Sequence, residues 1–115
     1  MSKRDYEIII VGAGPAGLTA GLYVSRSKVN VVCFEKMAPG GEILNTEFVE
    51  DYPGFDLIGG PELAAKFTDH AVKFGLKIEM EEVLEISKDG DDFLVKTDMG
   101  ERRCGAVIYT LGGIP

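Results

Sequence analysis

A glycine-rich hexapeptide near the start of the chain, at residues 12–17, constrains the fold more than any other feature. It follows a β-branched apolar run at 6–11, which predicts a strand buried on both faces. It also opens a segment with apolar residues at helical spacing, which predicts a helix over 15–28 with proline in its first turn. A second apolar run at 30–35 predicts another strand, so the pattern predicts a parallel βαβ unit.

The spacing inside this unit is typical of a dinucleotide-binding turn. The hexapeptide Gly12-Ala13-Gly14-Pro15-Ala16-Gly17 has the form GxGxxG, and Glu35 ends the second strand 18 residues after the last glycine. The first glycine would permit the tight turn, the second the approach of a pyrophosphate, and the third close packing of helix on strand. The helix N-terminus offers free N–H groups to that anion, while Glu35 would accept hydrogen bonds from ribose hydroxyls and repel a 2′-phosphate. The alternative, a turn that binds nothing, is disfavoured because all four elements occur in order: a strand, the glycine-rich turn, a helix, and a second strand that ends in an acidic residue.

The remaining sequence predicts one more helix and several short strands. Apolar residues at helical spacing, Val72 and Phe74 among them, predict a helix over 61–75. Strands are predicted at 77–80, 82–88, 92–97 and 102–110, the last of them central in the sheet. Residues 37–60 are irregular and rich in glycine and proline, and a loop of this length in a compact domain calls for a functional reason.

Length and charge narrow the class of protein. The chain has 115 residues, enough for one domain, and its net charge of −7 disfavours nucleic acid or an anionic membrane as partner. The two cysteines, Cys33 and Cys104, form no CxxC and lie in predicted buried strands, which together with the lack of a signal peptide favours a cytoplasmic protein. The acidic stretch at 79–85 is interpreted as a solvated strand face.

Beyond the hexapeptide, several stretches resemble the thioredoxin reductase family of FAD-binding flavoproteins. They occur in order along the chain, and some fall in the irregular loop, where packing constrains the sequence weakly: residues 10–20, 23–26, 39–43, 49–55 and 59–63. The resemblance implies an α/β fold, a Rossmann-like FAD-binding domain of three layers (ββα) with a central parallel sheet and a small β-meander. Residues 1–115 would be the N-terminal portion of a split FAD-binding domain. That portion would be truncated before the NADPH and CxxC domain and before the C-terminal FAD segment.

Carried over position by position, the resemblance implies a set of FAD contacts. The pyrophosphate would be held by the turn: Gly12, Gly14, Pro15, Ala16 and Gly17. The adenosine would lie beside Glu35 and Lys36, with the backbone of Val83 at the adenine. The ribityl chain and flavin ring would lie along the loop residues: Gly41, Glu42, Ile43 and Asp51. Gly112 is retained from a family Ala-Thr-Gly, but this chain reads Thr110-Leu111-Gly112, which weakens any contact assigned to the two residues before the glycine.

Two further departures concern the flavin ring. The family commonly has Gln at Glu42 and Asn at Asp51, and an ionised carboxylate accepts hydrogen bonds but does not donate them. Two carboxylates near the ring would disfavour an anionic reduced flavin and lower its potential, unless one of them is protonated. The alternative is that both side chains face solvent.

The implied function is FAD binding within a pyridine-nucleotide-dependent thioredoxin-disulfide reductase. In that family electrons pass from NADPH to FAD, to a CxxC, and to the disulfide of a thioredoxin-like protein, so a chain without CxxC is expected to be inactive alone. One alternative is a ferredoxin–NADP reductase of thioredoxin-reductase type, which lacks CxxC. Another is a non-catalytic fragment that forms a homo-oligomer through an exposed sheet edge. A stand-alone NAD-binding domain would leave the matches at 40–55 unexplained.

Overall fold

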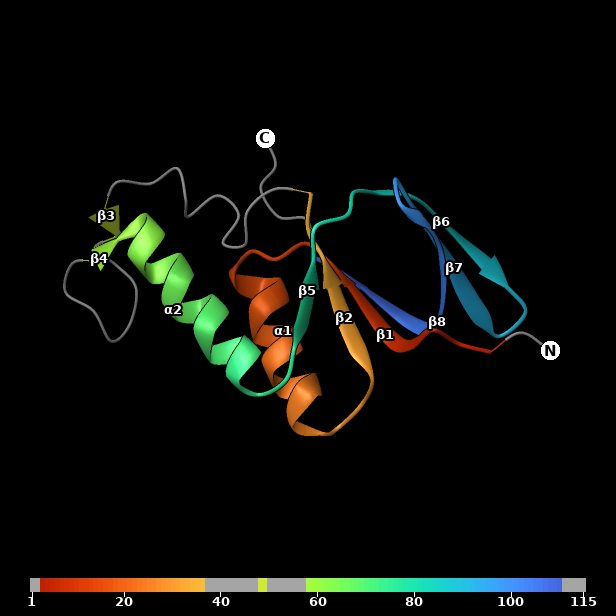
Figure 1. Cartoon of the computed structure of the whole chain (residues 1–115), viewed down its shortest axis with the longest axis horizontal. Helices are drawn as coiled ribbons and strands as arrows, with labels where there is room; N and C mark the ends of the chain where they lie inside the picture. The colour runs from red at the N-terminus through yellow and green to blue at the C-terminus, as the bar shows by residue number, and fades with distance from the viewer. Residues whose placement is uncertain (1–2, 37–47, 50–57, 111–115) are drawn as a thin grey trace.

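The computed structural model describes residues 3–36, 48–49 and 58–110 of the chain. The predicted βαβ unit, second helix and later strands are all present (Figure 1). In chain order the elements are β1 Tyr6–Val11, α1 Pro15–Arg26, β2 Val31–Phe34, β3 Phe48–Val49, β4 Ile58–Gly59, α2 Gly60–Lys73, β5 Lys77–Glu79, β6 Val83–Asp89, β7 Asp92–Thr97 and β8 Gly100–Tyr109. Within these ranges, neither helix is long and apolar enough to cross a membrane.

One six-stranded sheet organises the molecule, in the order β5-β2-β1-β8-β7-β6. Strands β5, β2, β1 and β8 are parallel, whereas β6, β7 and β8 form an antiparallel meander. The ten-residue β8 serves both parts, because its first half pairs with β7 and its second half pairs with β1. The last strand is therefore central, as the sequence predicted.

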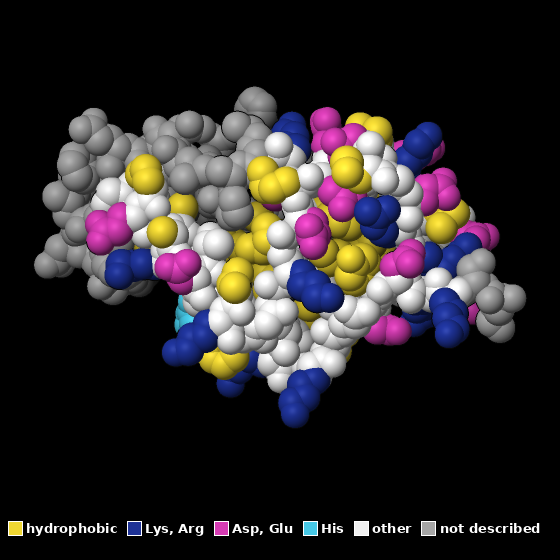
Figure 2. All heavy atoms as spheres, in the orientation of Figure 1, with side chains coloured by type: hydrophobic (Ala, Val, Ile, Leu, Met, Phe, Trp, Pro, Cys, Tyr) yellow, Lys and Arg dark blue, Asp and Glu magenta, His cyan; other side chains and the backbone are white. Residues whose placement is uncertain are grey.

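Side chains of β1 and β2 alternate between two hydrophobic cores. Ile10 and Cys33 face the helices and pack with Leu18 of α1. Ile9 and Phe34 face the opposite way and pack among residues of the meander. Figure 1 shows the resulting layers, with the helices on one side and β6 and β7 on the other. In Figure 2 apolar side chains gather over the middle of the molecule, and charged side chains surround them. The three-layer α/β prediction is confirmed.

The helix predictions were wrong at their edges. Helix α1 ends at Arg26 rather than near Lys28, because Lys28 has a φ of 61° and this left-handed conformation stops a helix. Of the apolar residues whose spacing predicted α2, Val72 is 49% exposed, and Phe74, which lies just past the end of the helix, is 41% exposed.

Candidate dinucleotide-binding site

The glycine-rich turn lies at the carboxyl end of β1, between β2 and β8. Its first residue, Gly12, has a φ of 102°, which a residue with a side chain rarely adopts, and its N–H donates to the carbonyl of Phe34 at 2.9 Å. Ligands of open α/β sheets bind beyond the carboxyl ends of the strands, so the turn stands where the fold favours a ligand.

The peptide unit that joins Gly12 to Ala13 is held at both ends. Its carbonyl oxygen accepts hydrogen bonds from the thiol of Cys33 at 3.3 Å and from the hydroxyl of Thr110 at 3.0 Å. Its N–H, on Ala13, donates to the Oε1 of Glu35 at 2.7 Å in a buried contact. The ends of β2 and β8 thus fix the orientation of one peptide in the turn.

Glu35 is buried, with 8% of its surface exposed, and its backbone N–H donates to the carbonyl of Glu79 at 3.0 Å. Glu35 is therefore held at two points, by its backbone bond to Glu79 and by the bond that its carboxylate accepts from the turn. Burial, and to a smaller extent the nearby Glu35, raises the pKa of the Cys33 thiol to about 12. This thiol is a structural donor at neutral pH and not a thiolate nucleophile.

Gly14 and Gly17 impose opposite steric conditions on the turn. A Cβ added to Gly17 would lie 1.9 Å from the carbonyl oxygen of Gly12 and 2.7 Å from the Thr110 hydroxyl, so this glycine permits the contact between helix and strand. A Cβ added to Gly14 would meet no described atom within 4 Å. Gly14 is the N-cap of α1; no side chain of the described residues caps that end, and the first turn of the helix holds no acid. Within the described part of the chain, this space beside helix N–H groups that have no intrahelical acceptor fits a pyrophosphate.

Comparison with known proteins agrees with this geometry. The sequence pattern of the Thi4 family matches residues 2–47. The thioredoxin reductase of Bacillus subtilis (strain 168) is 44% identical over 111 residues, which cover 96% of this chain and 35% of that protein. The chain is a homologue of the thioredoxin reductases.

Solved structures give the same result for the fold. The thioredoxin reductase of Lactococcus lactis superposes with a TM-score of 0.88 at 34% identity, over 91% of this chain and 35% of that one. The ferredoxin-flavin thioredoxin reductase of Clostridium acetobutylicum superposes with a TM-score of 0.85 at 27% identity, over 94% of this chain and 37% of that one. The chain thus spans about a third of the length of these relatives.

The structure brings many of the predicted site residues together. Gly12, Gly14 and Gly17 form the turn with Glu35 directly behind it, and Pro15 and the exposed Ala16 begin α1. Lys36 is exposed and follows Glu35. The other predicted residues lie outside the described ranges: Gly41, Glu42, Ile43, Asp51 and Gly112.

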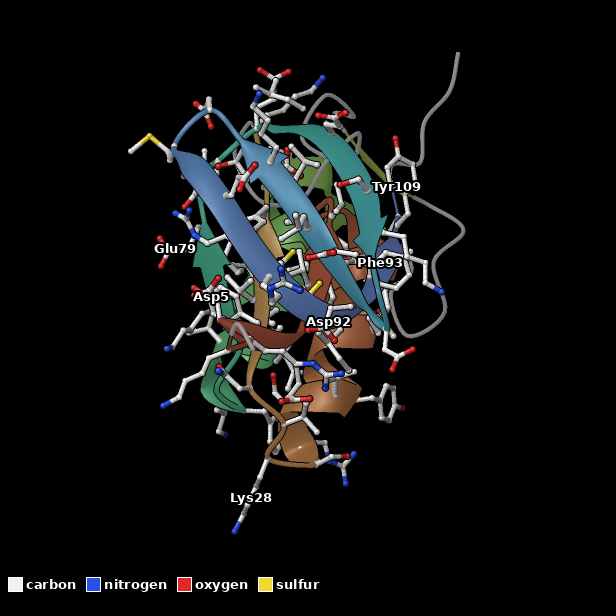
Figure 3. The ribbon with its side chains drawn as sticks, turned by 90° about the vertical axis from the view of Figure 1, so that its right-hand side faces the viewer. Asp5, Lys28, Glu79, Asp92, Phe93 and Tyr109 are labelled. Atoms are coloured by element: carbon white, nitrogen blue, oxygen red, sulfur yellow. The ribbon has the colours of Figure 1, made fainter. Side chains whose placement is uncertain are left out.

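Val83 belongs to the meander and not to the glycine-rich turn. It begins β6, pairs with Thr97 of β7, and packs its side chain against the meander-side core. Its side chain is half-buried, and the contact between its backbone and an adenine stays a prediction. The segment that leads to it starts at Glu79, whose carbonyl binds Glu35; Figure 3 shows the Glu79 side chain pointing away from the sheet.

Thr110 is the functional candidate that the sequence did not reveal. The displaced hydroxyl had weakened the case for a role at this position, yet its oxygen lies in the turn, 2.9 Å from the carbonyl oxygen of Val11. The pairing of Val11 with Tyr109 places it there. A sequence does not give the register of two strands separated by most of the chain, so no local signal could have found this contact.

Proposed function

We propose that the chain is the FAD-binding portion of a pyridine-nucleotide-dependent thioredoxin-disulfide reductase, with residues 1–115 forming the first part of a split FAD-binding domain. The observation that carries the proposal is the open space at Gly14, beside the uncapped start of α1 and the fixed peptide of Gly12 and Ala13. Its relatives named thioredoxin reductase support a flavin at this position.

The first turn of α1 would hold the pyrophosphate through backbone N–H groups, because the residues after Gly14 have no helical acceptor for them. Glu35 and Lys36 would lie beside the adenosine ribose, and the backbone at Val83 beside the adenine. The ribityl chain and flavin would lie along the remaining predicted contacts: Gly41, Glu42, Ile43, Asp51 and Gly112. Bound FAD supplies two-electron redox chemistry, and the chain's own contribution is to bind and orient it.

The partners of the whole reductase are also proposals. We infer NADPH as the electron donor, a thioredoxin-like protein as the acceptor and a homo-oligomer as the assembled form. Cys33 and Cys104 are both free and buried, which supports a reducing compartment such as the cytoplasm. Neither forms a CxxC, so the disulfide chemistry belongs to another part of the enzyme.

A second candidate differs in the source of electrons. The neighbour from Clostridium acetobutylicum has ferredoxin and flavin together in its name and shares the fold over 94% of this chain. In this candidate, reduced ferredoxin replaces NADPH and the FAD site is unchanged. Anaerobic addition of each donor to the flavin-loaded full-length reductase, followed by flavin bleaching, separates the two candidates.

The FAD site is tested by titrating the chain with FAD and following the visible absorption bands of the flavin. The matched variant is Gly14→Val. Gly14 has a φ of −76° and a ψ of −174°, which valine tolerates, and no described atom lies near the added side chain, so the variant should fold. It should bind FAD at least about tenfold more weakly, because the valine fills the space of the pyrophosphate. Equal binding by both proteins, or no binding by the unmodified chain, would contradict the proposal.

A further inference from the structure

The hydroxyl of Thr110 occupies a position between β8 and the glycine-rich turn that neither the turn pattern nor the relatives' names explain. The backbone N–H of Thr110 donates to the carbonyl of Val11 at 2.9 Å, which extends the pairing of β8 with β1 by one residue. This contact fixes the backbone of Thr110. Its Oγ1 then lies 2.9 Å from the carbonyl oxygen of Val11 and 3.0 Å from that of Gly12.

We propose that Thr110 is a positioning residue that holds the Gly12–Ala13 peptide in the orientation required for dinucleotide binding. A hydroxyl has one proton, so Thr110 shares it between two carbonyl oxygens at the end of β1. The second donor to the Gly12 carbonyl is the Cys33 thiol, and a thiol is a weak donor. The Thr110 hydroxyl is therefore the stronger constraint on this carbonyl.

The constraint is transmitted through the planarity of the peptide bond. Because the carbonyl of Gly12 and the N–H of Ala13 lie in one plane and point in opposite directions, holding one end orients the other. Gly12, with a φ of 102°, lacks the side chain that would otherwise restrict rotation of this peptide. If the peptide rotated, the Ala13 N–H would leave the buried Glu35 carboxylate, and that acceptor would lose a hydrogen bond of 2.7 Å.

Thr110 also sets the depth at which α1 meets the sheet. Its Oγ1 lies 2.7 Å from the point where a Cβ on Gly17 would be, so the hydroxyl and the Gly17 Cα are in contact. One side chain from the end of β8 thus touches the first turn of α1 and the peptide that precedes it. The consequence for FAD affinity rests on the proposed function, whereas the restraint on the peptide does not.

The test compares Thr110→Val, which removes the hydroxyl at constant shape, with Thr110→Ser, which retains it. The matched control is Thr68→Val, because the Thr68 hydroxyl also donates to a backbone carbonyl, that of Ala64 at 2.8 Å, but within α2. Hydrogen exchange of the Ala13 amide is measured by NMR in all proteins, and FAD affinity by titration.

Thr110→Val should speed Ala13 exchange and weaken FAD binding, each by about 2- to 10-fold relative to Thr68→Val, the range expected for one net hydrogen bond. Thr110→Ser should restore both values. Exchange at Ala13 that is the same in the Val variant and the unmodified chain overturns the proposal. Faster exchange at Ala13 in a chain that does not bind FAD supports the restraint and contradicts the proposed function instead.

A measurement on the unmodified chain keeps the proposal testable if the Val variant does not fold. A hydroxyl proton held by carbonyl oxygens exchanges slowly with water, so we expect a resolved Thr110 hydroxyl resonance with an NOE to an α-proton of Gly17. Rapid exchange of this proton in the folded chain would overturn the assignment.

Discussion

The two ends of strand β1 are both surrounded by polar groups, but the groups are of different kinds. At its carboxyl end, buried hydrogen bonds join the backbone of the glycine-rich turn to Glu35 and Cys33, and a partly buried one joins it to Thr110. At its amino end, ion pairs at the surface, whose side chains range from partly buried to exposed, join the residues before the strand to the meander. Figure 3 shows Asp5 and Asp92 in this charged region.

Arginines dominate the amino end. Arg4 pairs with Asp92 at 2.8 Å and with Glu7 at 2.9 Å. Arg103 pairs with Asp92 at 3.5 Å, and its backbone N–H donates to the Asp5 carboxylate at 2.8 Å. Hydrogen bonding to Arg4 is the main reason why the pKa of Asp92 lies below its usual value.

The difference lies in what replaces a contact when it is lost. Water solvates an exposed ion pair that is broken, so such pairs contribute little to stability. A buried group in the turn has no water to replace its partner, so losing the partner lowers the free energy of unfolding by the full cost of an unsatisfied buried polar group. The turn should therefore tolerate change poorly, and the charged end should tolerate it well.

The largest expected effect is that of Gly17→Ala at the carboxyl end of β1, and Gly105→Ala, near the amino end, is its comparison. Gly17→Ala places a Cβ 1.9 Å from the backbone oxygen of Gly12, which cannot move without breaking the turn. We expect a loss of about 3 kcal/mol in the free energy of unfolding, at the upper end for an overpacked site. Gly105→Ala brings a Cβ within 2.8 Å of the Arg4 guanidinium, which can swing away, and 3.2 Å from the carbonyl oxygen of Glu7, which has to shift by only a few tenths of an ångström. The loss should therefore be below about 1 kcal/mol.

Urea denaturation of both variants measures this pair of effects. A Gly105→Ala protein as unstable as Gly17→Ala would show that the charged end is as rigid as the turn. Retention of full stability by Gly17→Ala would show that the turn can relax, and the distinction between the two ends would fail.

The second prediction uses the Cys33 thiol, whose pKa is raised from the ordinary value of 9.0 to about 12. Above pH 9 the unfolded chain loses this proton while the folded chain keeps it, so stability is complete below pH 9 and falls as pH rises toward 12. One proton corresponds to a slope of about 1.4 kcal/mol per pH unit. Cys33→Ser keeps a donor to Gly12 but removes this ionisation, so its slope should be shallower by that amount.

The measurement is urea denaturation from pH 8.5 to 10.5 for the unmodified chain, Cys33→Ser and Cys104→Ser. The pKa of Cys104 is also raised by burial, so the third protein shows whether the effect is specific to the turn. Identical slopes in the unmodified chain and Cys33→Ser would mean that the Cys33 thiol is accessible to solvent, contrary to its 0% exposure.

Sequence patterns predicted the parts of the fold that depend on local periodicity. The apolar runs of β1 and β2 and the GxGxxG spacing were enough to predict the turn, and the tight contact at Gly17 is confirmed by the 1.9 Å Cβ distance. Periodicity does not tell which apolar residues of a helix remain uncovered, so it did not predict that Val72 is 49% exposed.

Contacts between distant strands were beyond the sequence. Glu81 was interpreted as part of a solvated face, but its carboxylate accepts hydrogen bonds from Thr97 at 2.6 Å and from Arg102 at 3.1 Å. The Thr110 hydroxyl reaches Gly12, 98 residues earlier, for the same kind of reason. Both contacts follow from the register of β8 against its neighbours, and only the folded sheet specifies it.

The smallest expected effect is the loss of the Arg4 ion pairs. Arg4→Gln should lower the urea midpoint slightly at low ionic strength, and the difference should disappear in 1 M NaCl because salt screens exposed charges.

Asp92 determines the sign of the pH dependence of this effect. Its pKa is below the ordinary value of 3.8, so its contribution is present above pH 3.8 and is lost as pH falls below it. The unmodified chain and Arg4→Gln should therefore converge in acid. The control is Glu35→Gln, which changes a buried contact of the turn and should show a midpoint shift that salt does not remove. Salt sensitivity confined to Arg4→Gln would confirm that ion pairs stabilise the amino end of β1 and hydrogen bonds the carboxyl end. Equal salt sensitivity of the two variants would contradict this distinction.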